Sequence, residues 1–521
     1  MAQAPNTAHP EVNPWIVAVA VMFGTFMEVL DTTVVNVSLP HIAGSLSSTV
    51  EEATWVLTSY LVANAIILPL TGWLGNYFGR KRVLMVAVTG FTITSLMCGL
   101  APNLRLLVFF RVLQGLSGGS LQPLSQAVLL ETFPPEKRGS AMGFWGLGIV
   151  VAPILGPVLG GWLTDSYTWR WVFYINIPVG IVTIFMIKQF IFDPPYIKRA
   201  TSRIDYWGIG MLAVAIGALQ ITLDKGQQED WFASNWIVAA VVLGVAMLVM
   251  FIIHELRSAA PVLNLRIFKI GTYRTGIILM TALGFVLYGS IVLLPLLLQT
   301  VLGYSAFDAG MATSPRGIGS FIAMPIIGAI MVKFDSRKLL GLGLGVSAIT
   351  LFMFSRLSLN TGYWDVFWPQ LIQGVALGLV WVPLTTITMD PIPKETMGNA
   401  TSIFSLTRNL GASMGIASVT TMLARGQQRH INVLGAHVNP YDSQAGRLSR
   451  GFRAAFLNSG SDLYTASRQS TAAMFGMVQR QAAMLTFVDI FWLLGAIFVA
   501  MIPLVLLMKR PKRGGDAVAA H

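Results

Sequence analysis

The chain has 521 residues, of which 54% are hydrophobic and only 11% are charged, and its mean hydropathy is +0.67. A soluble domain carries about 25% charged residues, so this composition excludes a water-soluble protein and indicates a chain that crosses a membrane many times. The net charge of +12 does not indicate a nucleic-acid partner, because the basic residues lie in short segments between apolar runs. The single cysteine, Cys98, excludes an internal disulfide and supports no metal site.

Fourteen apolar segments are long enough to cross the hydrocarbon core as helices. In chain order these predicted spans are 15–37, 54–75, 83–101, 105–131, 140–163, 172–192, 207–223, 236–256, 274–300, 307–332, 339–357, 366–390, 398–423 and 485–508. The first segment has no basic residues before it and contains two acids, so we interpret it as the first span and not as a cleavable signal peptide.

The basic residues fix the expected orientation of these spans. With the N-terminus inside, the predicted cytoplasmic segments hold 21 lysines and arginines and the short outer segments hold three. Positive charge gathers in cytoplasmic loops, so both termini are expected in the cytoplasm. The stretch 424–484 then falls outside as one long loop rich in Gln, Ser and Arg.

An internal repeat divides the chain into two parts. Residues 131–141 resemble residues 390–400 at an offset of 259, and residues 69–78 resemble residues 325–334 at an offset of 256. Shorter matches keep the same order: Gln114-Gly115 with Gln373-Gly374, and Pro123–Ser125 with Pro383–Thr385. Matching spans lie eight apart, so the two copies have the same orientation, as in one large class of secondary transporters.

The sequence therefore predicts an all-α polytopic membrane protein with two six-helix halves and two inserted helices. The expected parts are a cytoplasmic segment (1–14), an N-terminal half (15–192), a cytoplasmic linker (193–206), two inserted helices (207–256), a C-terminal half (257–508) that includes the long outer loop, and a basic cytoplasmic tail (509–521).

The first span carries two acids, Glu28 and Asp31, which share one helix face. A carboxylate inside a membrane is costly and is functional by default, and these two groups are candidates for proton coupling. The alternative is that they lie in the outer headgroup region, where Asp31 caps or pairs locally. Thr32 and Asn36 follow at helical spacing and are expected to line the same cavity.

Arginines also lie inside other predicted spans. Arg111 cannot deprotonate, so it needs an acidic partner, a carbonyl partner or water, and it is a candidate for proton coupling; the alternative is snorkelling to the headgroups. Arg316 in the span 307–332 and Arg408 in the span 398–423 pose the same question. We expect Gln114, Arg408 and Asn409 to line the substrate cavity.

Small residues and prolines in the span 140–163 indicate a bent, closely packed helix. This suits a gate, and static packing is the alternative. One stripe of small residues comprises Gly148, Ala152, Gly156 and Gly160. The stripe beside it comprises Pro153, Pro157 and Gly161.

The segment 72–82 reads GWLGNYFGRKR and joins two spans. Its expected gating residues are Gly72, Gly79, Arg80 and Arg82. Glu131 and Asp390, one in each half, end spans at the same side of the membrane and are natural partners for these cations. The alternative is that the cations only set the topology.

Taken together, these motifs resemble the major facilitator superfamily, and within it the fourteen-span drug–proton antiporters of the EmrB type. The resemblance covers nearly the whole chain. The motifs that carry it are Leu30–Pro40, Gly72–Arg82, Arg111–Gly115, Ala152–Gly161, Trp169–Pro178 and Arg408–Gly411. The chain differs at Asn76, where the superfamily usually has an acid, and Glu28 is an addition to the usual first motif.

The resemblance implies export of lipophilic or amphipathic compounds in exchange for protons, from the bacterial inner membrane. It implies as partners membrane lipids, a periplasmic adaptor protein and an outer-membrane channel, with the outer loop as a docking element or a tolerated insertion. No nucleotide-binding loop is present in the sequence. We therefore expect a proton gradient to drive transport, and we expect no bound cofactor. A dedicated exporter of one metabolite or siderophore is the alternative function. A membrane-embedded enzyme and a channel are both disfavoured.

Overall fold

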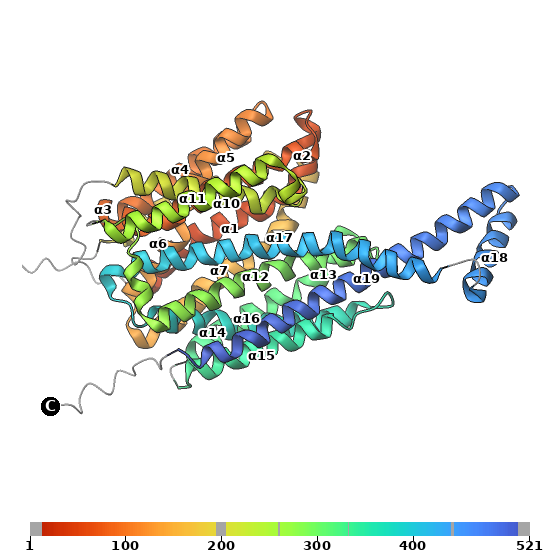
Figure 1. Cartoon of the computed structure of the whole chain (residues 1–521). Coiled ribbons are helices and arrows are strands. Elements are labelled where there is room, and N and C mark those ends of the chain that lie inside the picture. The colour runs from red at the N-terminus through yellow and green to blue at the C-terminus, as the bar shows by residue number, and fades with distance from the viewer. Residues whose placement is uncertain (1–12, 194–204, 259–260, 332, 439–441, 509–521) are drawn as a thin grey trace, which may run out of the picture.

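The computed structural model describes residues 13–193, 205–258, 261–331, 333–438 and 442–508. Within these ranges the protein is all-α, with helices α1–α19 and no strand (Figure 1). The predicted cytoplasmic tail 509–521, nearly all of the N-terminal segment 1–14 and most of the linker 193–206 lie outside the described residues.

The helices run along one bundle axis. The N-terminal half contains α1 (Pro14–Ser45), α2 (Val50–Ala53), α3 (Trp55–Phe78), α4 (Arg80–Leu100), α5 (Leu104–Gly118), α6 (Leu121–Thr132), α7 (Arg138–Ser166), α8 (Trp171–Tyr174) and α9 (Asn176–Phe190). The inserted pair is α10 (Tyr206–Lys225) and α11 (Asn235–Arg257). The C-terminal half contains α12 (Gly271–Thr300), α13 (Ala306–Thr313), α14 (Pro315–Ile330), α15 (Ser336–Phe354), α16 (Tyr363–Met389), α17 (Met397–His437), α18 (Ser443–Asn458) and α19 (Leu463–Val505).

Each of the fourteen predicted spans overlaps one helix or two consecutive helices, and some spans extend a few residues past the helix ends. Ten described helices are long and apolar enough to cross a membrane, and the two bent parts of α7 add an eleventh. The span 105–131 is divided between α5 and α6, and the span 307–332 between α13 and α14. The all-α polytopic fold is thereby confirmed, whereas the count of fourteen spans and the side of the termini stay predictions.

The internal repeat is visible in how the helices pack. In the N-terminal half, a side chain on Gly115 of α5 would collide with the backbone oxygen of Tyr60 in α3. In the C-terminal half, a side chain on Gly374 of α16 would collide with the backbone oxygen of Arg316 in α14. Gly374 matches Gly115 at the offset of 259, and Arg316 matches Tyr60 at the offset of 256. The two halves therefore share the same close contact between helices.

The two halves meet closely at the end of the bundle that carries Arg80–Arg82, which we call the basic end. Gly72 of α3 lies against the backbone of Gly398 and Asn399 in α17, with 2.6 Å from its absent Cβ to the nearest atoms. Gly328 of α14 lies against Gly139 and Ser140 of α7 in the same manner, at 2.7 Å. These contacts close the basic end of the seam between the halves.

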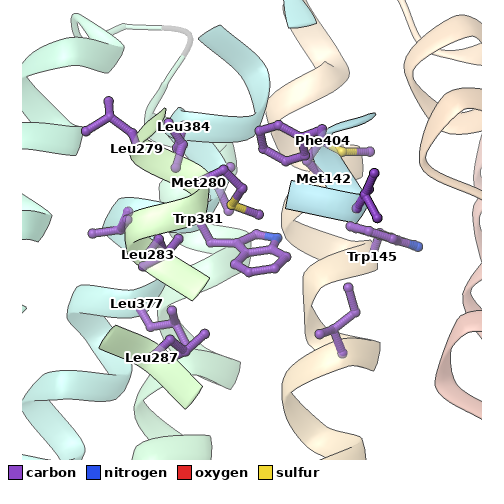
Figure 2. Packing of buried hydrophobic residues seen from close by; sticks show 14 of the residues in the cluster. Met142, Trp145, Leu279, Met280, Leu283, Leu287, Leu377, Trp381, Leu384 and Phe404 are labelled. Carbon is purple, nitrogen blue, oxygen red and sulfur yellow. The ribbon is translucent and has the colours of Figure 1, made fainter. Parts of the chain in front are cut away.

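Apolar side chains fill the seam beside these contacts. Met142 and Trp145 of α7 belong to one buried cluster with Met280 of α12 and Trp381 of α16. Figure 2 shows Met280 and Trp381 pointing toward α7 from the C-terminal half. Because this packing is apolar and contains no ion pair between these residues, the surfaces can separate without leaving a charge unpaired.

The stretch 424–484, expected as a loop, is largely helical. α17 continues unbroken to His437 and α19 already starts at Leu463, with α18 between them. Together they form a protrusion that extends well beyond the rest of the bundle (Figure 1). The search for apolar runs did not predict these helices, because they are polar and lack an apolar run long enough to span a membrane.

Candidate functional site

Asp31 lies at the centre of a buried polar network inside the N-terminal half. Its side chain is completely buried and forms an ion pair with Arg111 of α5, with 2.5 Å between Oδ2 and Nη1. Its other oxygen, Oδ1, accepts hydrogen bonds from Gln114 at 3.1 Å and from Asn176 of α9 at 2.8 Å. Both oxygens therefore have partners, as a buried carboxylate requires.

Arg111 is fully buried and is held from several directions. Its Nε donates to the backbone oxygen of Val56 at 3.0 Å, and its Nη1 also donates to Gln114 at 2.8 Å. The guanidinium lies over the ring of Tyr60, 4.1 Å from the ring centre. Arg111 thus connects α5 to α1 and α3 and does not extend to the headgroups.

Glu28 lies one turn before Asp31 on α1, but its surroundings differ. The side chain is 4% exposed. Oε1 accepts a hydrogen bond from Asn64 of α3 at 2.8 Å, whereas Oε2 has no hydrogen-bond partner among the described residues. The charged group that faces Glu28 from the C-terminal half is Arg408. Glu28 therefore belongs to the seam, and Asp31 to the interior of one half.

Arg408 of α17 reaches across this seam. Its Nη2 donates a hydrogen bond to Gln122 of α6, and its guanidinium lies 5.5 Å from the ring centre of Trp381. Its Nε has no partner among the described residues. A buried guanidinium that keeps an unused donor gains from a ligand that supplies an acceptor or an aromatic ring.

The predicted gating residues gather at the basic end. Arg80 and Glu131 form a buried ion pair, with side chains 1% and 3% exposed. Gly79 has φ +90°, and a side chain there would collide with Asp193, which accepts a hydrogen bond from the backbone of Lys81 at 2.8 Å. Arg82 is exposed, and Asp390 is half-buried at the end of α16.

The small-residue stripe of α7 faces α1. Side chains on Gly148, Gly156 and Gly160 would collide with Met22, Thr33 and Val34 of α1. α7 bends by 41° between Pro135–Pro153 and Val158–Ser166, which agrees with the loss of backbone hydrogen bonds at its prolines. Pro153 is half-buried and Gly161 faces open space, and the side chain of Pro157 lies outside the described residues.

The residues expected to line the substrate cavity separate into two groups. Gln114 lies in the Asp31 network and not at the seam. Thr32 donates to the backbone oxygen of Val29 at 2.8 Å, and Asn36 is exposed. Arg408 and half-buried Asn409 lie on α17. Of these residues, Arg408 is the one whose contacts join the two halves.

Sequence reasoning did not select four polar residues that complete these networks. They are Asn64, Gln122, Asn176 and Trp381. Asn64, Gln122 and Asn176 are amides inside predicted spans, and a buried amide needs hydrogen-bond partners as a buried acid does. Trp381 carried no such signal, since aromatic residues are common in apolar helices.

Two halves with repeated helix packing, which meet across a seam that holds buried polar groups, are the architecture of a secondary transporter. The profile described as Major Facilitator Superfamily matches residues 21–416. The chain is 37% identical over 509 residues to the multidrug export protein EmrB of Escherichia coli K12, covering 97% of this chain and 98% of that one. It is 36% identical over 502 residues to the fatty acid resistance protein FarB of Neisseria gonorrhoeae, covering 96% and 97%.

Solved structures show the same fold at low sequence identity. A double-tryptophan variant of XylE has a TM-score of 0.60 at 14% identity, covering 96% of this chain and 97% of that chain. The human organic anion transporter MFSD10 has a TM-score of 0.59 at 15% identity, covering 94% and 100%. The chain belongs to the major facilitator superfamily and, within it, is an EmrB-type member. It is a multi-pass protein of the bacterial inner membrane.

Proposed function

We propose that the protein exports amphipathic or lipophilic compounds of several chemical types in exchange for protons. Its similarity to proteins named multidrug export proteins supports multidrug efflux, and it favours that function over a dedicated exporter of one metabolite or siderophore. The observation that carries the proton part is the completely buried Asp31–Arg111 pair with its two amide donors.

The proposed coupling starts from the charge balance of that pair. While Asp31 is ionised, it neutralises Arg111 and joins α1 to α5. A proton arriving from the periplasm neutralises the carboxylate and leaves the permanently charged guanidinium without a counter-ion. Because an unpaired buried charge is costly, the helices then favour another arrangement in which Arg111 finds acceptors. Release of the proton to the cytoplasm restores the pair.

The substrate is proposed to bind in the seam between the halves. The seam offers aromatic and methionine side chains, among them Trp381, Trp145 and Met280, next to the polar groups of Glu28 and Arg408. Apolar pockets with a few polar groups bind lipophilic compounds of varied shape. Glu28, with its unpaired oxygen, is the second candidate for proton exchange.

The test is drug-induced proton movement in proteoliposomes with an acidic interior. Wild-type protein is expected to move protons when a lipophilic substrate is added, and Asp31→Asn is expected not to. Equal proton movement in wild type and Asp31→Asn would exclude Asp31 as the proton carrier. Glu28→Gln would then be the next variant to measure. If wild type moves no protons with any lipophilic compound, the proposed antiport is wrong.

Assembly with a periplasmic adaptor protein and an outer-membrane channel is part of the proposal. The protrusion supports it, because α17 and α19 extend beyond the bundle on the predicted periplasmic side (Figure 1). Replacing residues 438–462 by a short linker is expected to abolish drug resistance of cells but to leave proton-coupled transport in proteoliposomes intact. Loss of both activities would indicate instead that the protrusion is needed for transport itself.

A further inference from the structure

The inserted hairpin of α10 and α11 lies on the side of the bundle where α3 and α17 come together (Figure 1). These two helices belong to opposite halves and touch directly at the basic end, through Gly72 against Gly398 and Asn399. Ser413 of α17 lies 14 residues beyond Asn399, which is about 21 Å farther along an α-helix. At that level α10 contacts both α3 and α17.

The contact of α10 with α3 is extensive. Gly217 of α10 leaves room for Val62 and Ile66 of α3, which would be 3.7 and 3.4 Å from its absent Cβ. Near the end of α10 farthest from the basic end, which we call the far end, the hydroxyl of Thr58 donates a hydrogen bond to Asp224. The hairpin is therefore fixed to the N-terminal half both by packing and by a polar contact.

Lys225 strengthens this attachment. It is only 4% exposed. Its Nζ donates to Thr54 at 2.6 Å and lies 5.1 Å from the ring centre of Trp55. Separation of α10 from α3 would remove the Thr54 acceptor and the Trp55 ring and leave Lys225 with Gln228 of the hairpin at 3.0 Å, so this separation costs free energy.

The contact with α17 consists of neutral side chains. Gln220 donates to the hydroxyl of Ser413 at 2.7 Å, and the indole Nε1 of Trp231 donates to the hydroxyl of Thr421 at 2.9 Å. Hydrogen bonds between neutral groups contribute little net stability, and both partners can turn to other acceptors when they part. This side of the hairpin is consequently the easier one to release.

The turn after α10 places Trp231 against α17. Asp230 and Trp231 both have left-handed backbone conformations, with φ of 52° and 53°, which non-glycine residues avoid. Gly226 accepts a hydrogen bond from the backbone of Trp231 at 2.7 Å, and a side chain on Gly226 would lie 2.7 Å from the indole ring. Backbone strain that persists in a structure points to a constraint of function.

We propose that the inserted hairpin moves as one body with the N-terminal half and acts as a releasable strap on the C-terminal half. The strap contacts, Gln220–Ser413 and Trp231–Thr421, form while the basic end of the seam is closed. They break when the halves rock, because α17 turns relative to α3 and the hairpin stays on α3. This inference rests on the proposed function, since only a transporter that alternates between two states needs a strap that releases.

The test compares two matched cross-links in a Cys98→Ser background, which leaves no native thiol. The first pair is Gln220→Cys with Ser413→Cys, across the strap. The second is Thr58→Cys with Asp224→Cys, within the attachment to α3. Each is joined by a bifunctional thiosulfonate reagent that a reductant removes, and substrate-driven proton movement is measured in proteoliposomes before joining, after joining and after reduction.

Fixing one state stops a two-state cycle, so the strap cross-link is expected to lower transport by about tenfold or more and reduction to restore it. The α3 cross-link is expected to change transport by less than about twofold. The proposal is overturned if the strap cross-link has no effect, because the insertion would then be peripheral. It is equally overturned if the α3 cross-link stops transport, because the hairpin would then not move with the N-terminal half.

Spin labels at the same four positions separate this proposal from the proposed function. The distance between positions 220 and 413 is expected to differ between acidic and alkaline pH, while the distance between positions 58 and 224 stays constant. This readout needs no transported substrate. Absence of proton coupling with a changing 220–413 distance would count against the antiport proposal alone, whereas two constant distances would overturn the strap.

Discussion

The N-terminal and C-terminal halves share their packing but not their buried charge. Gly115 on Tyr60 and Gly374 on Arg316 are the same helix contact in two copies. At the position of Arg111, however, the offset of 259 places Gln370, which is 3% exposed. α12, which takes the place of α1 in the second half, has no charged residue between Thr275 and Thr300.

This difference separates two requirements of a rocking transporter. Close helix contacts are needed in both halves, because each half must move as one body. A group that binds and releases a proton is needed only once, and a buried charged pair destabilises a half unless it is fully paired. The N-terminal half carries the buried Asp31–Arg111 pair, whereas Arg408 of the C-terminal half lies at the seam.

The largest effect is expected when the N-terminal half is given the neutral side chains that the C-terminal half has at the matching positions. Asp31→Asn leaves Arg111 buried without a counter-ion, which is expected to lower the free energy of unfolding by about 3–5 kcal/mol. Proton movement driven by substrate is expected to fall by about 100-fold or more, because the exchangeable proton is lost. Thermal unfolding in detergent and the proteoliposome assay measure the two effects.

The double variant Asp31→Asn with Arg111→Gln is the control for this prediction. It removes both charges and places glutamine where the second half has Gln370, so most of the lost stability is expected to return while proton coupling stays absent. A double variant as unstable as the single one would mean that Asp31 and Arg111 are not coupled to each other. Recovery of proton movement would move the coupling site elsewhere.

A somewhat smaller effect is expected from the glycines that close the basic end. Gly72→Ala and Gly328→Ala place a Cβ 2.6 and 2.7 Å from backbone atoms of the opposite half, so the closed state is strained in both variants. Transport is expected to fall by about tenfold, and cysteines introduced in the seam are expected to become more reactive from the basic side. Gly341→Ala, which meets no atom within 4 Å, is the control and should behave as wild type.

Similar losses in Gly72→Ala and Gly328→Ala would show that the two pseudo-equivalent contacts share the closure. A loss in only one of them would show that one contact acts as the gate and the other as a hinge. Unchanged transport and reactivity in both variants would contradict the assignment of these contacts to a closed state.

The comparison of halves also shows what the sequence could predict. The repeat and its offsets could be predicted because glycines and prolines recur where helices approach each other. A side chain in place of these glycines would collide with the backbone of the neighbouring helix. Asp31, Glu28 and Arg111 were readable because charged residues in apolar segments are rare and need partners. These predictions depend on composition along one helix at a time.

Contacts between distant helices could not be predicted in the same way. The choice of Asp31 and not Glu28 as the partner of Arg111 depends on how α1 is rotated against α5, a property set by packing. The placement of Gln114 beside Asp31 and not in a cavity has the same cause. The helices of the protrusion were missed because their stability comes from pairing with each other, not from an apolar spanning run.

A milder test addresses the neutral positions of the C-terminal half. Gln370 and Gln373 are nearly buried, and the Oε1 atom of each has no partner among the described residues. If this half only packs, Gln370→Leu removes an unsatisfied polar group and is expected to change the free energy of unfolding by no more than about 1 kcal/mol, with transport preserved. A large loss of transport with an unchanged melting temperature would instead assign Gln370 a role in the cycle.

The smallest effect concerns the protrusion, which has no counterpart in the N-terminal half. Asp462 caps the start of α19, and hydrogen bonds from Thr465 and Tyr464 hold the pKa of this carboxyl below its usual value of 3.8. A carboxyl with a lowered pKa contributes stability above that usual value and loses it as the pH falls through the folded-state pKa. The start of α19 is therefore expected to fray at strongly acidic pH while the bundle stays folded.

Hydrogen exchange of residues 463–466, corrected for the intrinsic rate, measures this fraying. In wild type, protection is expected to be constant from neutral pH down to the usual carboxyl range and to fall below it. Asp462→Ala is expected to show the lower protection at every pH, and Asp462→Asn, which still accepts the hydrogen bonds, should lose the pH dependence but keep most of the protection. Fraying that follows pH equally in Asp462→Asn would mean that a group other than Asp462 controls this end.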